Sequence, residues 1–76
     1  MKELVETLAK ALVDDVEEVK VTSREENDVL ILELHVASPD MGKIIGKQGR
    51  IARAIRTVVR AAAVRKDKKV IVDIVQ

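Results

Sequence analysis

The residues with the clearest capacity for binding chemistry form a short glycine loop, Gly46-Lys47-Gln48-Gly49, within a basic segment. Glycine at both ends lets the backbone turn sharply and approach a ligand closely, because no Cβ intervenes. A helix predicted to begin near Arg50 would direct its unpaired N–H groups and the positive end of its dipole at the loop. The segment therefore predicts a phosphate site, whose candidate cationic ligands are Lys43, Lys47, Arg50 and Arg53.

Aliphatic residues flank the loop on both sides, at Ile44, Ile45 and Ile51. They could line the binding site, or they could belong to the hydrophobic core. Core packing is the favoured interpretation for Ile45 and Ile51.

Basic residues continue beyond the loop. Arg53, Arg56 and Arg60 fall within one narrow arc of the predicted helix, the arginine stripe. The stripe faces away from the expected core arc of the helix, which contains Ile51, Ile55, Val58 and Ala62. A solvated face is the favoured interpretation of Arg56 and Arg60, whereas Arg53, one turn from the loop, is the better candidate for ligand contact. A second basic wall could form from Lys66, Lys68 and Lys69, although a charged turn is usually just hydrated.

Nothing in the sequence indicates catalysis. The nucleotide-binding P-loop requires four residues between its glycines and Ser or Thr after its Lys. Here three residues separate Gly42 from Gly46, and Gln48 follows Lys47. His35 is the single histidine and there is no cysteine, so no thiolate or histidine-based metal site can form. We therefore expect no catalytic residues, no metal and no cofactor.

The loop must be positioned by the elements around it, which hydrophobic periodicity predicts. The pattern gives a helix over 2–13, a strand over 16–22, a polar connection over 23–28, a strand over 29–36, a short helix from 39 or 41 to 45, a long helix from 50 to about 64, a basic turn over 65–69 and a strand over 70–75. The second strand would direct Leu30, Leu32, Leu34 and Val36 to one face, and the last strand would direct Val70, Val72 and Ile74 to the same face.

This α-β-β-α-α-β order predicts an α+β fold formed by a single domain over residues 1–76. The first two strands can form an antiparallel hairpin, and the helical crossover lets the last two lie parallel. We expect a three-stranded mixed sheet with three helices packed on one face.

Charge is divided unevenly along the chain. Residues 1–40 carry four basic against eleven acidic residues, a net charge of −7, and residues 41–76 carry ten against two, a net charge of +8. One interpretation is a surface that attracts polyanions opposite one that repels them; the other is charge pairing within the fold. No apolar run exceeds four residues, which is too short for a membrane span or signal peptide, so we expect a cytoplasmic protein without membrane association.

The stretch from Asp40 to Ala52, with Gly46-Lys47-Gln48-Gly49 at its centre, resembles the signature of the KH RNA-binding domain. The element order resembles the type II form usual in bacteria, and the stretch is similar to small single-domain bacterial KH proteins of the KhpA type. The resemblance implies a loop that clamps about four nucleotides of single-stranded RNA, with bases on an aliphatic floor for which Ile44, Ile45 and Ile51 are the candidates. That mode suits a chain without Phe, Tyr or Trp. The runner-up function is a protein-docking or ribonucleoprotein-assembly module that uses the KH scaffold.

The resemblance also implies a homodimer, a second bacterial KH-containing RNA-binding protein as partner, and a role in post-transcriptional regulation or as an RNA chaperone. Apolar residues outside the predicted core face favour self-association. Two surfaces are expected to offer them: the long helix, through Ala52, Val59, Ala63 and Val64, and the open sheet face, through Val29, Ile31, Ile71 and Val75. The alternative is that the helix over 2–13 covers those of the long helix and that those of the sheet are ordinary scattered surface aliphatics.

Overall fold

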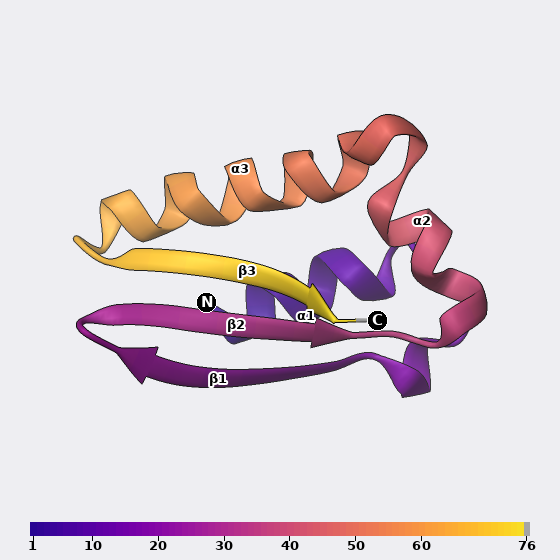
Figure 1. The fold of residues 1–76 in the computed structure, drawn as a ribbon, viewed down its shortest axis with the longest axis horizontal. Helices are drawn as coiled ribbons and strands as arrows, with labels where there is room; N and C mark the ends of the chain where they lie inside the picture. The colour runs from indigo at the N-terminus through magenta and orange to yellow at the C-terminus, as the bar shows by residue number, and fades with distance from the viewer. Residues whose placement is uncertain (76) are drawn as a thin grey trace.

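The α-β-β-α-α-β order predicted from the sequence is the order of the computed structural model (Figure 1), which describes residues 1–75. Gln76, at the end of the predicted domain, lies outside the described residues. The elements are α1 (Lys2–Lys10), β1 (Lys20–Glu26), β2 (Val29–His35), α2 (Met41–Ile45), α3 (Arg50–Arg65) and β3 (Lys69–Val75), with 3₁₀ turns at Val16–Glu18, Ser38–Asp40 and Lys47–Gly49.

The β1–β2 hairpin differs from the sequence prediction at both ends of its first strand. Residues 16–18 form a 3₁₀ turn, and β1 continues through residues 23–26, which were expected to be a loop. The strands are joined by Asn27 and Asp28 alone, both with positive φ, 52° and 65°. Asn and Asp tolerate that conformation, and a two-residue turn of this kind matches the twist of paired strands. The predicted connection over 23–28 was therefore too long, because residues 23–26 are polar residues of the strand.

The predicted mixed sheet is confirmed, with strand order β1-β2-β3. β1 and β2 are antiparallel, and β2 and β3 are parallel with Leu32 opposite Val72. The crossover between β2 and β3 contains α2, the glycine loop and α3, and Figure 1 shows α2 at the end of β2 with α3 running back above β3. The loop is thus fixed at one end of the domain.

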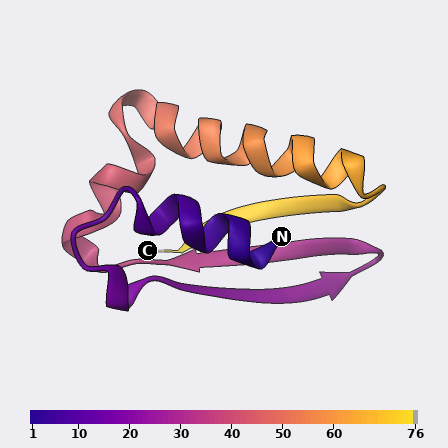
Figure 2. The ribbon, with the colours of Figure 1, turned by 180° about the vertical axis from the view of Figure 1, so that it is seen from behind.

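The hydrophobic core lies between one face of the sheet and the helices. Figure 2 shows α1 crossing the sheet on this face. The most deeply buried large side chains come from every layer: Val5, Leu32, Leu34, Ile44 and Val59. Because Leu32 and Leu34 alternate with half-buried residues along β2, the predicted core face of that strand is confirmed. The opposite face is open, and Ile71 on it is 54% exposed.

The orientation of α3 corrects one prediction. The expected core arc was Ile51, Ile55, Val58 and Ala62, whereas the buried residues of the helix are Ala52, Ile55, Val59 and Ala63. The helix is rotated so that two alanines, Ala52 and Ala63, meet the rest of the fold together with Ile55 and Val59, and Val58 is left 46% exposed. Ala52, Val59 and Ala63 are therefore core residues and cannot form the self-association surface expected of them.

Helix α1 ends at Lys10, earlier than the predicted residue 13. The next residues form a turn in which the Ala9 carbonyl accepts hydrogen bonds from the N–H groups of Leu12 and Val13. In the part of the chain that the structure describes, no helix has the length and apolar character needed to span a bilayer.

Candidate nucleic-acid interface

The glycine loop has an unusual backbone. Gly46 (φ 74°, ψ 176°), Gln48 (φ 57°, ψ 26°) and Gly49 (φ 74°, ψ 15°) all have positive φ. The loop begins where the Gly46 N–H closes α2 by bonding the Gly42 carbonyl at 2.8 Å, and α3 starts immediately after Gly49. The N–H of Arg50, the first residue of α3, bonds the Lys47 carbonyl. The N–H groups that follow it have no partner within the helix and lie next to the loop, which provides donors for an anion.

The two glycines have different surroundings. A Cβ added at Gly46 would lie 2.5 Å from Cγ1 and 2.8 Å from Cβ of Ile51, whereas nothing lies within 4 Å of a Cβ added at Gly49. Gly46 therefore permits the loop to pack against α3. Gly49 leaves the space beside the backbone open to a ligand.

The cations nearest the loop are Lys47 and Arg50, which are both exposed. Among the described residues, no carboxylate lies within ion-pair distance of either side chain. Arg53 donates a hydrogen bond of 3.2 Å from Nη2 to the Gln48 carbonyl. Arg53 therefore braces the loop from the first turn of α3 while keeping other donors for a ligand.

Lys43, the fourth predicted phosphate ligand, has other partners. Its Nζ donates to the Asp14 carboxylate and lies 3.6 Å from Oδ1 of Asp40. The hydrogen bond to Asp14 is the main reason that the pKa of Lys43 is raised. The charge of Lys43 is therefore offset by two carboxylates, and the side chain ties α2 to the segment that follows α1.

Asp40 is a structural residue whose role the sequence did not predict. Its side chain is 3% exposed, and its carboxylate accepts hydrogen bonds from the N–H groups of Asp15 (3.0 Å) and Asp14 (3.3 Å). Although Asp40 occupies the N-cap position of α2, its side chain does not cap that helix. The Asp15 bond is the main cause of the lowered pKa of Asp40, with contributions from Asp14 and Lys43.

A groove of about 360 Å³ lies beside the loop. Its lining comes from four segments, with aliphatic residues on the floor and two arginines: Ile45, Gly49, Ala52, Arg53, Arg56 and Ile74. Ile45 is half-buried and faces this groove, although core packing had been favoured for it. Ile44 has no exposed surface, so it supports the floor from within and cannot touch a ligand.

Two groove residues were missed or undervalued from the sequence. Ile74 was assigned only to the core face of its strand, and no signal in the sequence shows that this end of β3 opens into the groove. Arg56 had been interpreted as a solvated residue, but its Nε donates a hydrogen bond of 3.2 Å to the Val72 carbonyl. The arginine stripe thus borders the groove at Arg53 and Arg56, while Arg60 lies one turn further along α3.

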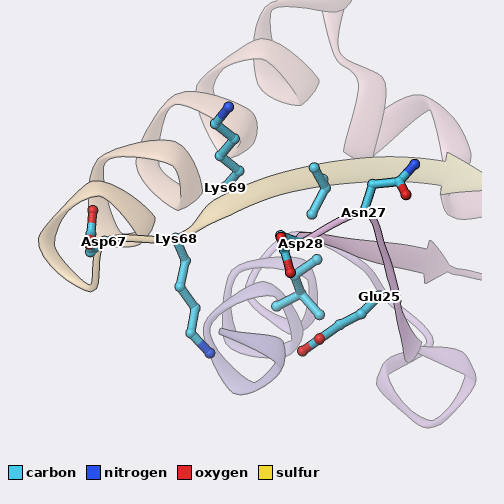
Figure 3. A pocket seen from close by; sticks show the side chains of 8 residues that line it. Glu25, Asn27, Asp28, Asp67, Lys68 and Lys69 are labelled. Atoms are coloured by element: carbon cyan, nitrogen blue, oxygen red, sulfur yellow. The ribbon is translucent and has the colours of Figure 1, made fainter.

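Two lysines of the predicted second basic wall, Lys68 and Lys69, lie in a different region of the surface from the groove. Lys68 and Lys69 line a depression of about 510 Å³ at the opposite end of α3, together with Glu25, Asn27, Asp28, Asp67 and two β2 residues. In Figure 3 the two lysine side chains point apart. Because acidic residues share this depression, it is not a uniformly basic continuation of the groove.

A second, apolar groove of about 340 Å³ separates α1 from α3. Its lining is aliphatic apart from Arg50: Leu8, Ala11, Leu12, Ile51, Ala54, Ile55 and Val58.

His35, at the end of β2, lies on the sheet between Lys20 and Val75 in the strand register. Within residues 1–75 no three His, Cys, Asp or Glu side chains are grouped as metal ligands would be.

Comparison with known proteins gives one family match over residues 2–74, to the KH domain described as KhpA/KhpB. Curated relatives are similar over nearly the whole chain. "RNA-binding protein KhpA" of Clostridium perfringens is 60% identical over 99% of this chain and 100% of its own length. The protein of the same name from Aquifex aeolicus is 43% identical over 100% of this chain and 96% of its own length. No solved structure matches the chain.

Proposed function

The chain belongs to the KhpA/KhpB KH-domain family, and from this premise we propose that it binds short segments of single-stranded RNA without a chemical step. The observation that carries the proposal is the exposed loop Gly46–Gly49 at the start of α3, directly beside a groove with an aliphatic floor. The names of the curated relatives support RNA as the ligand.

The loop would hold the sugar-phosphate backbone. Open space beside Gly49 lets a phosphate approach the main chain, where the first N–H groups of α3 and the helix dipole favour an anion. Lys47 adds positive charge from within the loop, and Arg50 and Arg53 add it from the first turn of α3. Lys43 is not included, because Asp14 and Asp40 already engage it.

The groove floor would receive the bases. Ile45, Ala52 and Ile74 come from three different elements and offer apolar contact without aromatic stacking. Such contact requires bases that are not paired in a duplex, so single strands should bind in preference to double strands. Binding of a few nucleotides gives modest sequence selectivity, which suits an RNA chaperone or post-transcriptional regulator acting in the cytoplasm.

The partner that we propose is a second copy of the chain, docked at the apolar groove between α1 and α3. Val58 is 46% exposed at this groove, and covering it would add apolar burial to a domain whose own core is small. Two linked RNA sites would also raise affinity through effective concentration. The joint family description of KhpA and KhpB leads us to propose a second KH protein as an alternative occupant.

The double variant Lys47→Asp/Gln48→Asp tests the proposed RNA site. It places two carboxylates where phosphates would lie, and Asp tolerates the positive φ of position 48. We expect affinity for unstructured single-stranded RNA, measured by fluorescence anisotropy, to fall at least about tenfold with little change in melting temperature. The control variant Lys20→Asp/Ser23→Asp makes the same change in net charge on exposed residues of β1.

Unchanged RNA binding by the loop variant would exclude the loop as the site. RNA binding that is absent from the parent protein as well would favour the protein-docking module instead.

A further inference from the structure

Arg56 is held differently from the next arginine of its stripe. Its Nε donates to the carbonyl of Val72 at 3.2 Å, and Val72 belongs to β3, an edge strand of the sheet. An edge strand presents backbone groups without strand partners, so this bond satisfies one of them and fixes the guanidinium beside the groove. For Arg60, which is exposed one turn further on, the described residues provide no comparable bond.

The bond determines which donors remain. A guanidinium carries five N–H donors in a rigid plane, and the Val72 carbonyl takes the one on Nε. The Nη groups stay available as a planar fork, whose geometry suits two adjacent acceptor atoms. Arg56 shares the groove with the aliphatic side chains of Ile45 and Ile74.

The position of Arg56 favours a base over a phosphate as the ligand of this fork. Phosphates would lie at the loop, where Lys47, Arg50 and the start of α3 provide charge. Bases of the same strand would then extend across the floor toward β3, to which Arg56 is anchored. The fork therefore lies where a base edge, not the backbone, would be presented.

We propose that Arg56 makes the groove selective for a base that presents two adjacent hydrogen-bond acceptors. Guanine does so through O6 and N7, and cytosine does so through O2 and N3. Adenine alternates donor and acceptor along its edges, and an N3–H donor separates the two carbonyl oxygens of uracil. The inference rests on the proposed RNA-binding function and adds the class of base that this site accepts.

A set of uracil RNAs of about eight nucleotides, each with one central uracil replaced by guanine, cytosine or adenine, tests the selectivity. Anisotropy titrations of the full chain should show the guanine or the cytosine RNA binding about five-fold or more tightly than the adenine and all-uracil RNAs. Comparison of the guanine RNA with the cytosine RNA shows which of the two acceptor-bearing bases is preferred. If guanine is preferred, replacing it with 7-deazaguanine, which lacks the N7 acceptor, should remove the preference.

Two matched variants assign the selectivity to Arg56. Arg56→Lys keeps the charge and loses the planar fork, so it should reduce the affinity for the preferred RNA to that for all-uracil RNA. Arg60→Lys makes the same change without the backbone anchor and should leave the preference intact. Melting curves would verify that both variants are folded.

A preference that survives in Arg56→Lys, or a parent protein that binds all four RNAs equally well, would overturn the inference and leave the RNA-binding proposal standing. A uniform loss of affinity in Arg56→Lys without any change in preference would assign the fork to a phosphate and also overturn it. Failure of the parent to bind any of the RNAs would overturn both proposals.

Discussion

The carboxylate of Asp40, which is almost completely buried, accepts a hydrogen bond from the backbone N–H of Asp15 at 3.0 Å. A buried carboxylate is costly unless such bonds satisfy it. The bond joins the start of the α2 region to the chain that leaves α1, so the position of the glycine loop depends on it.

The lowered pKa of Asp40 predicts an acid dependence of stability. The ionised form is favoured in the folded state, mainly by the Asp15 N–H. Its contribution is therefore present above the unfolded pKa, about 4, and is lost as the pH falls through the lower folded pKa. Asp40→Asn should reduce the melting temperature at pH 7, and its difference from the parent should shrink toward about pH 3. Asp73→Asn, at an exposed site, is the control. A difference that grows on acidification would contradict this role.

The two loop glycines should respond unequally to alanine. Gly46→Ala places a Cβ 2.5 Å from Cγ1 of Ile51 in a backbone conformation with φ 74° and ψ 176°. We expect a loss of about 1–3 kcal/mol or more in the free energy of unfolding. Gly49→Ala meets no neighbour and should cost only about 1 kcal/mol, for the left-handed conformation. Urea denaturation measures both. Equal losses would show that the contact with Ile51 is not the deciding factor.

The salt dependence of RNA binding should reflect about three phosphate contacts, from Lys47, Arg50 and Arg53. On single strands the slope of log affinity against log salt concentration should be about −2, at about 0.7 per contact. Arg50→Gln should make it less steep by about 0.7. Lys43→Gln should leave the slope unchanged, because Asp14 and Asp40 engage that side chain. A slope near zero would disagree with a phosphate clamp.

Self-association should depend on Val58. Val58→Glu introduces a charge into the apolar groove between α1 and α3, so light scattering at micromolar concentration should show a shift from dimer to monomer. The control is Thr57→Glu, which makes the same charge change at a neighbouring exposed residue that does not line the groove. This variant should remain dimeric. A Val58→Glu protein that stays dimeric would direct attention to the open sheet face.

Local patterns were sufficient for the element order and the loop. Alternation along β2 identified Leu32 and Leu34 as core residues, and the glycine spacing identified positions 46 and 49. Local patterns were insufficient where a side chain contacts a residue that lies far away in the chain. The partner of Lys43 is Asp14, and the rotation of α3 depends on how its buried residues, Ala52 and Val59 among them, pack against the rest of the fold. Neither can be read from spacing on one helix.

The groove was predicted only in part for the same reason. Its floor combines Ile45, Ala52 and Ile74 from three elements, and the sequence offered no signal that their ends converge. The anchor of Arg56 is a backbone carbonyl, which every residue possesses and no composition can indicate.

The parallel pairing of β2 and β3 couples the formation of the groove to the order in which the chain folds. The β1–β2 hairpin needs only a two-residue turn, whereas Leu32 meets Val72 across forty positions of the chain. Closing so long a segment costs entropy before its contacts are gained, so non-local pairing is slow. The groove requires Ile74 from the last strand and is complete only when this closure has occurred. A growing chain that still lacks β3 would therefore have its glycine loop but no finished groove, and RNA that binds the finished groove would hold the closed chain together.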